Sequence, residues 1–349
     1  MVFQQKQIPQ GNRTGGKQPL DRRVAVAPMM GWTDRHDRYF LRLISPHALL
    51  YTVMLTSGAL LHGDAARFLQ FDPAEHPVAL QLGGSDPQEL AKAAKMGEAA
   101  GYDEINLNCG CPSDRVQRGA FGACMMKQPT LVADCVAAMH EAVDVPVTVK
   151  TRIGVDDYDS YDFLCDFIGQ ISEKGGCDVF IIHARKAWLK GLNPKQNRTV
   201  PPLRWDIIHR LKQDFPHLTI ILNGGIDNLD DVREQLQHSD GVMIGREAYQ
   251  NPYFLATLEE GVFGTPAETL RSRHETIRAL LPYIEDELSK GAQLYDITRH
   301  ILGLFQGLPG AKKWRRILSE KAFLPSAGPE VVLEALSHVA EIGDEKRYA

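Results

Sequence analysis

One cysteine and one lysine of this chain stand where short apolar segments end, and both residue types can do chemistry there. Cys111 follows the apolar run 104–108, and Lys150 ends the run 145–150. A thiol in such a loop can deliver a proton or attack as a nucleophile, although most single cysteines are small buried hydrophobic groups. A lysine that points into a cavity can form a Schiff base, or its fixed charge can hold an electron-rich ring. Both residues are therefore candidate catalytic or binding groups.

Two glycine-bearing turns follow the last two apolar runs of this part of the chain. Asn223-Gly224-Gly225 ends one run, and Gly245-Arg246 ends the next. Because glycine has no side chain to obstruct the backbone, such turns expose N–H groups that can bind a phosphate. Glycines also serve simply to make tight turns, but two such turns in succession, one with an arginine attached, favour phosphate. The phosphate could belong to a cofactor or to a substrate.

Other polar residues also end apolar runs. Gln81 and His183 are ambiguous by themselves, since a lone histidine at a strand end is often a hydrogen-bonded core residue. Arg152 lies two residues after Lys150, so alternation along a strand puts both side chains on one face. This shared face favours a Lys150 that points into a cavity over one that extends to solvent along a rim.

Eight short apolar runs, separated by helical stretches, position these residues. The runs cover residues 24–27, 49–54, 78–82, 104–108, 145–150, 179–183, 219–223 and 241–244. Most of these runs are short and almost continuously apolar, as expected of strands that are buried on both faces. Alternating strands and helices predict a parallel sheet, and eight strands without a switch point predict an α/β fold closed into a (β/α)8 TIM barrel. The polar residues then gather at the carboxyl ends of the strands, where such barrels bind ligands.

The chain changes character after residue 264, where strand-like runs cease. Helical spacing predicts helices at 270–290, 295–306, 314–320 and 331–342, in addition to 87–100 and 129–143 within the barrel. We therefore expect a catalytic barrel over residues 21–260 and a C-terminal all-helical domain over residues 261–349. Residues 1–20 are polar and rich in glutamine and glycine, which predicts a disordered tail.

The composition is typical of a globular protein of the cytoplasm. No apolar run is long enough to cross a bilayer, and the first residues lack the apolar segment of a secretory signal. Six cysteines include no C-x-x-C pair, so we expect no metal site. The net charge of −5 argues against a general coat for nucleic acid but leaves room for a local basic patch. We expect a cytoplasmic protein that acts as a monomer and does not enter a membrane.

Several motifs, in order along the expected strands, resemble those of the tRNA-dihydrouridine synthase family. They are APMMGWTD at 27–34, EINLNCGCPS at 104–113, GAC at 122–124, VKTRIG at 149–154, HAR at 183–185 and GVMIGR at 241–246. Two further motifs, ITRH at 297–300 and GAKKWRR at 310–316, resemble the A subfamily, which acts on uridines 20 and 20a of the tRNA D-loop. One departure is Cys109, where the family usually has an aliphatic residue. Alternation places it opposite Asn108, so we expect it to serve packing.

The resemblance implies an FMN cofactor that NADPH reduces and that then reduces the C5=C6 bond of uracil in tRNA. The hydride would pass from flavin N5 to C6, and Cys111 would protonate C5 as a general acid. The charge of Lys150 would stabilise the anionic reduced flavin. The FMN phosphate would occupy the corner formed by Asn223, Gly224, Gly225, Gly245 and Arg246. The residues implied to contact the rest of the cofactor are Pro28, Met29, Met30, Gln81, Lys150 and His183.

The resemblance also implies how tRNA is held. The target base must leave the stacked tRNA to reach a site in the barrel mouth, where Asn108 would hydrogen-bond the uracil. The residues implied to contact the substrate are Asn108, Arg152, Arg185, Lys195, Arg198, Lys312 and Arg315. Since some of them lie on the barrel rim and others in the helical domain, the tRNA elbow would be gripped between the two. An acidic protein must concentrate positive charge in this way to bind a polyanion.

Three other functions fit parts of the sequence. An FMN-dependent dehydrogenase of a free pyrimidine, like dihydroorotate dehydrogenase, would share the phosphate corner and the lysine but has no need of a basic helical domain. An aldolase-type lyase would use Lys150 as a Schiff-base amine and carry no flavin. A tRNA-binding protein without catalysis would not need Cys111. A yellow protein that NADPH reduces would exclude the last two functions.

Overall fold

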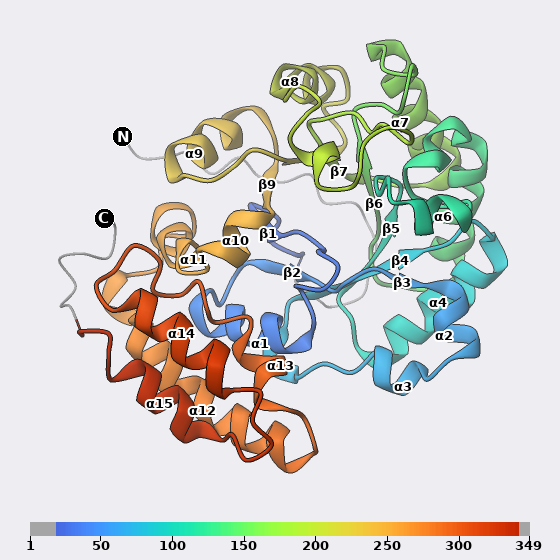
Figure 1. The fold of residues 1–349 in the computed structure, drawn as a ribbon. Helices are drawn as coiled ribbons and strands as arrows, with labels where there is room; N and C mark the ends of the chain where they lie inside the picture. The colour runs from blue at the N-terminus through green and yellow to red at the C-terminus, as the bar shows by residue number, and fades with distance from the viewer. Residues whose placement is uncertain (1–18, 342–349) are drawn as a thin grey trace.

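The protein is described by a computed structural model over residues 19–341, and eight parallel strands at its centre close into a barrel surrounded by helices (Figure 1). The strands are β1 (Val24–Val26), β2 (Leu49–Tyr51), β4 (Val78–Gly83), β5 (Glu104–Asn108), β6 (Val147–Arg152), β7 (Val179–His183), β8 (Thr219–Asn223) and β9 (Gly241–Ile244). They pair in the order β2-β1-β9-β8-β7-β6-β5-β4, and pairing of β2 with β4 completes the ring. The predicted barrel is confirmed, while the expected tail, residues 1–20, lies outside the described residues apart from its last two.

The run expected at 49–54 forms two strands rather than one. β2 ends at Tyr51, and the two-residue strand β3 (Leu55–Thr56) pairs with the carboxyl end of β4. Between them, the hydroxyl of Thr52 accepts the N–H of Gln81 at 3.0 Å. A side chain therefore takes the place of a backbone oxygen, and regular pairing stops at this point.

Alternation along the strands divides the barrel interior into an apolar part and a polar part. The apolar part is formed by Ala25, Ala27, Leu49, Tyr51, Ala79, Ile181, Ile221 and Met243. β5 and β6 contribute polar side chains instead, and Asn106 and Asn108 pair in register with Thr148 and Lys150. Polar groups thus continue from the mouth of the barrel into its interior.

Helices cover the outside of the barrel, as Figure 1 shows. They are α1 (Arg35–Ile44), α2 (Ser57–His62), α3 (Ala65–Phe68), α4 (Pro87–Ala100), α5 (Asp114–Arg118), α6 (Pro129–Ala142), α7 (Tyr161–Gly175), α8 (Trp205–Asp214), α9 (Leu229–His238), α10 (Arg246–Gln250) and α11 (Phe254–Leu258). Helix α4 has the expected bounds because Asp86 caps it by accepting the N–H of Glu89, and Gly101, with φ of 102°, ends it. Within residues 19–341, no helix combines the length and the apolar character needed to span a membrane.

Within the described residues, four α-helices follow the barrel and lie together beside α1 (Figure 1). They are α12 (Arg273–Ser289), α13 (Leu294–Thr298), α14 (Ala311–Lys321) and α15 (Pro329–Leu336). The helix expected over 295–306 is wrong beyond Thr298. There the chain turns so close to the barrel that a Cβ on Gly303 would lie 2.3 Å from the backbone oxygen of Gln250. The indole of Trp314 donates to the carbonyl of Ile301 at 3.2 Å, which satisfies an oxygen that a longer helix would have used.

Candidate active site

Lys150 and Asn223 meet at the carboxyl ends of β6 and β8. The Nζ of Lys150 donates to Oδ1 of Asn223 at 2.9 Å, and Nδ2 of Asn223 donates to the carbonyl of Met243 at 2.7 Å. Burial lowers the pKa of Lys150 to about 7, and the charge of Arg152 contributes in the same direction. Among residues 19–341, no carboxylate forms an ion pair with Lys150. An anionic ligand would therefore find an amine whose charge is not yet compensated.

The ring of His183, at the end of β7, lies against the glycine turn that follows β8. Gly224 and Gly225 have φ values of +107° and +84°, which glycine adopts without strain. A Cβ on Gly224 would lie 3.1 Å from Nε2 of His183, and one on Gly225 would lie 2.4 Å from Cδ2 of Leu203. Burial, and then the neighbouring cations, lowers the pKa of His183 well below its ordinary value. Its Nδ1 is buried and has no hydrogen-bond partner in the part of the chain that is described, so a neutral imidazole is left for a ligand.

The second glycine turn leads directly into the short helix α10. A Cβ on Gly245 would meet no atom within 4 Å, so the backbone there faces open space, and the exposed Arg246 is the first residue of the helix. The indole of Trp205 donates to the carbonyl of Gly224 at 2.8 Å and holds the first turn in place. Because β8 and β9 are neighbours in the barrel, the two turns form one corner. Open backbone beside an arginine suits a phosphate group.

The loop that carries Cys111 is held by Asn108, the last residue of β5. Oδ1 of Asn108 accepts the N–H of Gly110 at 3.1 Å and that of Cys111 at 3.0 Å. Gly122, with φ of +75°, passes so close that a Cβ there would lie 2.6 Å from the carbonyl oxygen of Cys111. The thiol is partly exposed, and its Sγ lies 3.4 Å from Oγ of Ser113. Cys111 is thus held in one position at the barrel mouth.

The two other cysteines near this loop have different surroundings. Cys109 is completely buried in the core between the strands and the helices, and burial raises its pKa well above the ordinary value. This burial agrees with the expected packing role. The Sγ of Cys124 lies 3.0 Å from the carbonyl oxygen of Phe121, and burial raises the pKa of this thiol as well. Cys124 is partly exposed, as Cys111 is, but its sulfur faces a backbone oxygen.

Arg152 ties two loops of the site together. Its Nε donates to the carbonyl of Gly110 at 2.8 Å, and its Nη1 donates to the carbonyl of Asn197 at 3.1 Å. The residue is 5% exposed, and burial lowers its pKa to about 10. The guanidinium therefore joins the Cys111 loop to the loop after β7 instead of extending into solvent. The expected contact of Arg152 with tRNA stays a prediction.

Three arginines around the mouth carry positive charge without a carboxylate partner among the described residues. Arg185 is partly buried, whereas Arg198 and Arg246 are exposed. Burial, and then the charge of Arg246, lowers the pKa of Arg185 and that of Arg198. Lys195 is exposed on the same loop as Arg198. Uncompensated charges this close together favour an anionic ligand.

Some basic residues of the C-terminal region form ion pairs with acidic residues, and others do not. Lys312 and Arg315 on α14 are exposed and form no ion pair within residues 19–341, while Trp314 between them is buried. Arg299, in contrast, forms an ion pair with Asp34, which follows the loop after β1. The free charges thus lie on the outer face of α14.

Sequence reasoning missed a second set of polar residues, inside the barrel and below the site. The side chains of Glu104, Asn106 and Thr148 are completely buried and are joined by hydrogen bonds to one another and to Gln81. The alternation within residues 104–108 was a usable signal, because it places Glu104 and Asn106 on the same face as Asn108.

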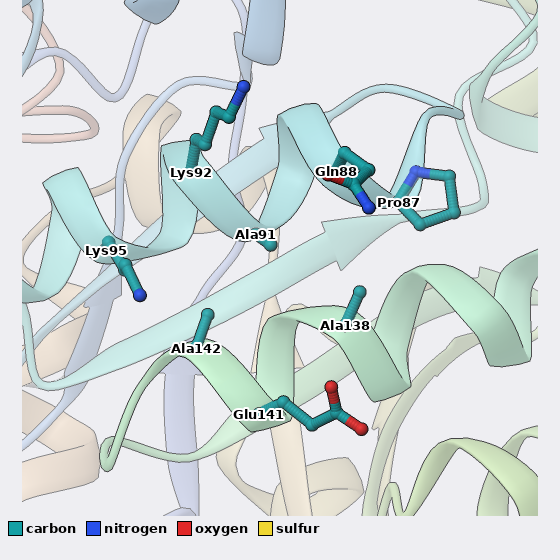
Figure 2. Close-up of a pocket in the computed structure, with 8 residues that line it drawn as sticks. All are labelled: Pro87, Gln88, Ala91, Lys92, Lys95, Ala138, Glu141 and Ala142. Carbon is teal, nitrogen blue, oxygen red and sulfur yellow. The ribbon is translucent and has the colours of Figure 1, made fainter.

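A shallow groove on the outer wall of the barrel, between α4 and α6, lies apart from these residues (Figure 2). It is lined by Pro87, Gln88, Ala91, Lys92, Lys95, Ala138, Glu141 and Ala142. None of the candidate site residues borders it. Within the described chain, no group of three His, Cys, Asp or Glu side chains is arranged to hold a metal ion.

The fold and the site define a class of protein, a (β/α)8 barrel whose lysine, cysteine and arginines gather at the carboxyl ends of the strands. Within this class, a family model described as "Dihydrouridine synthase (Dus)" matches residues 25–340. The chain belongs to the dihydrouridine synthase family.

Curated relatives are similar to this chain along most of its length. The tRNA-dihydrouridine(20/20a) synthase of Vibrio parahaemolyticus is 60% identical over 317 residues, which cover 91% of this chain and 97% of the relative. The Escherichia coli K12 protein of the same name is 60% identical over 319 residues, covering 91% and 92%. Among solved structures, a 2-naphthoyl-CoA reductase complex matches with a TM-score of 0.52 at 10% identity, over 71% of this chain and 51% of that chain. This last likeness shows a shared fold.

Proposed function

We propose that this chain is a tRNA-dihydrouridine synthase that reduces uridines 20 and 20a of the tRNA D-loop, in the cytoplasm and as a monomer. Relatives with this activity in their names are 60% identical over 91% of the chain. The observation that carries the proposal is the setting of Cys111, a partly exposed residue whose loop is held by Asn108 and by the guanidinium of Arg152. A thiol in this position can protonate a base that enters the mouth.

The residues of the mouth fit FMN. The two glycine turns and Arg246 suit its phosphate, and the uncompensated charge of Lys150 suits an anionic isoalloxazine ring. The buried Nδ1 of His183, which has no partner among the described residues, is a further free contact. The residues that would hold FMN are Pro28, Met29, Met30, Gln81, Lys150, His183, Asn223, Gly224, Gly225, Gly245 and Arg246. A flavin bound here and reduced by NADPH would supply the hydride for C6 of uracil.

The side chains of this chain would do the rest of the work. Cys111 would hold the proton that is delivered to C5 of uracil. Asn108 has both lone-pair directions of its oxygen occupied by backbone N–H groups, so its remaining amide hydrogen would be donated to a uracil carbonyl. Lys150 would keep its positive charge next to an anionic partner, because such a partner reverses the effect of burial on its pKa.

The helical region over residues 261–349 would bind tRNA as a second domain. Lys312 and Arg315 offer exposed charges there, while Lys195, Arg198 and Arg185 offer charges on the barrel side. A tRNA elbow held between these two groups would neutralise charges that have no acidic partner among residues 19–341. An enzyme for a free pyrimidine, the main alternative, has no use for the exposed charges of α14.

Mass spectrometry of tRNA nucleosides from a strain that lacks this protein tests the proposal. The proposal expects dihydrouridine to disappear from positions 20 and 20a and to return when the wild-type gene is restored. Unchanged dihydrouridine at both positions would contradict it. Loss of dihydrouridine at other positions of the D-loop would contradict the assigned positions but would support the proposed reaction.

A further inference from the structure

A chain of hydrogen bonds runs through the barrel interior from Glu104, the first residue of β5, to the Cys111 loop. Thr148 donates to Oε1 of Glu104 at 2.6 Å, and Nδ2 of Asn106 donates to Oγ1 of Thr148 at 2.8 Å. Nε2 of Gln81 donates to Oδ1 of Asn106 at 2.8 Å, and Nδ2 of Asn108 donates to Oε1 of Gln81 at 2.9 Å. The chain ends where Oδ1 of Asn108 accepts backbone N–H groups of the Cys111 loop.

At the Glu104 end of this series of hydrogen bonds, the donor and the acceptor of each bond are fixed. Glu104 forms an ion pair with Arg22 and accepts a hydrogen bond from the hydroxyl of Tyr51 at 2.6 Å. Burial, and then the charge of Glu104, raises the pKa of Tyr51 well above its ordinary value, so this phenol remains a donor. A carboxylate accepts only. Since Oγ1 of Thr148 lies 2.6 Å from Oε1 of Glu104, the hydrogen between them must come from the threonine.

The upper end of the chain requires the same direction. Backbone N–H groups can only donate, so the atom of Asn108 that faces them must be its oxygen. Its amide nitrogen must then face Gln81, and the nitrogen of Gln81 must face Asn106. Both ends thus agree on the orientation of every amide, and each of these side chains is at most 9% exposed. Within residues 19–341, each of the Gln81 and Asn108 amides donates one hydrogen bond, so the second hydrogen of each is left for a ligand.

We infer that Glu104, Thr148 and Asn106 are positioning residues that hold the amides of Gln81 and Asn108 with their N–H groups toward the ligand. The inference rests on the proposed function, in which Gln81 contacts the flavin and Asn108 contacts the uracil. The inference implies that the ligand atoms facing these two amides are hydrogen-bond acceptors, either carbonyl oxygens or an unprotonated ring nitrogen. None of the three residues touches the reacting atoms.

The test uses an isosteric break in the chain and a matched control. Thr148→Val removes the hydroxyl that links Asn106 to Glu104, while Thr148→Ser keeps it. Tyr51→Phe removes a different hydrogen bond to the same carboxylate oxygen but leaves the chain intact. Should Thr148→Val fail to fold, Thr148→Cys, similar in size but with a weakly hydrogen-bonding thiol, takes its place.

The first measurement needs no cofactor. Side-chain amide resonances of Gln81 and Asn108 in the NMR spectrum of the flavin-free protein should shift in Thr148→Val and stay in place in Thr148→Ser and Tyr51→Phe. Equal shifts in Thr148→Val and Tyr51→Phe would overturn the inference. Because no flavin takes part, this result is independent of whether the proposed function is right.

The second measurement is FMN affinity, followed by fluorescence titration of the flavin-free protein. Thr148→Val should weaken FMN binding about five- to tenfold, the size of one lost hydrogen bond, and Thr148→Ser should restore it. In a Gln81→Ala background, Thr148→Val should have no further effect, since the coupling between the two sites runs through the amide. A full effect of Thr148→Val in that background would overturn the inference. A wild-type protein that binds no FMN would overturn the proposed function. The amide resonances would then still test whether Thr148 positions the two amides.

Discussion

The carboxylate of Asp34 forms an ion pair with the guanidinium of Arg299, which lies 265 positions later in the chain. Asp34 caps helix α1 by accepting the N–H groups of His36 and Asp37, directly after the loop that follows β1. The ring nitrogen Nε2 of His300 lies 3.1 Å from the same carboxylate. Arg299 and His300, two neighbouring residues of the C-terminal region, therefore hold the end of the loop after β1. The same loop carries Met29 and Met30. This contact joins the proposed flavin side of the barrel to the proposed tRNA-binding helices.

Asp37, beside this contact, should be a source of instability at neutral pH. Both its carboxyl oxygens are buried without a hydrogen-bond partner among residues 19–341, and Nδ1 of His300 is 3.8 Å away. Burial, and then the charge of Asp34, raises the pKa of Asp37 well above its ordinary value. The folded state thus keeps a proton that the unfolded state loses above about pH 3.9, so this residue makes stability fall as pH rises up to the folded pKa.

Asp37→Asn should therefore raise the free energy of unfolding at pH 8, by about 1 kcal/mol or more. The new amide can donate to His300, and the gain should shrink as the pH is lowered toward 4. Urea denaturation across this pH range measures it, with the exposed Glu268→Gln as a control for the change in charge. A variant that is less stable than wild type at pH 8, or a gain that is the same at every pH, would contradict this account.

Cys111→Ala should separate the two halves of the proposed reaction. Flavin binding and NADPH oxidation should stay nearly intact, while dihydrouridine formation falls about a hundredfold or more, as expected for a lost general acid. Single-turnover measurements on the reduced enzyme give the second rate. Cys109→Val is the matched control, since Cys109 is buried in the core and should tolerate a replacement of similar volume at a cost below about 1.5 kcal/mol. Reduction of tRNA by Cys111→Ala at the wild-type rate would remove Cys111 from its role.

Lys150→Met should weaken FMN binding and make it independent of pH near neutrality. Burial holds the pKa of Lys150 at about 7 without ligand, so its charge decreases as pH rises through 7. Wild-type affinity for the anionic cofactor should fall between pH 7 and pH 9, and this slope should vanish in the variant. Titration of flavin-free protein at each pH measures both. A covalent adduct on Lys150 after borohydride treatment with substrate would instead support Schiff-base chemistry.

Charge reversal on α14 should weaken tRNA binding without affecting the flavin. Lys312→Glu with Arg315→Glu should lower tRNA affinity and flatten its dependence on salt, because fewer counterions are released. Lys92→Glu with Lys95→Glu makes the same change on α4, on the opposite side of the barrel (Figure 1), and should have little effect. Affinity is measured over a salt series. The same loss in both variants, or none in the first, would mean that α14 does not hold the tRNA.

Much of the fold was predictable because strands buried on both faces leave continuous apolar runs. The same logic placed the candidate residues at the strand ends, since parallel strands bring their carboxyl ends together. The turn after Thr298 was not predictable, because it depends on the close approach of Gly303 to Gln250, two segments far apart in the chain. The pairing of Arg299 with Asp34 likewise exists only after folding. Spacing along the sequence carries no information on such contacts.

The polar interior of the barrel marks a different limit. Asn106 alternates with Ile105 and Leu107 along its strand, and Thr148 stands between Val147 and Val149, so the sequence puts both side chains on a face that an apolar core could have filled. Only the register that sets Asn106 beside Thr148, and Glu104 below them, shows that these groups satisfy one another. Sequence alone can mark a polar residue on an inward face, but its partners come from neighbouring strands.

The most direct measurement of the central claim maps dihydrouridine in a tRNA that starts without it. An unmodified tRNA transcript is incubated with the purified protein, FMN and NADPH, and its nuclease fragments are analysed by mass spectrometry. The account predicts, for the wild type, a mass increase of two hydrogens for each uridine reduced at positions 20 and 20a, and almost none for Cys111→Ala. A wild-type protein that binds and oxidises NADPH through FMN yet leaves both positions unreduced would contradict it.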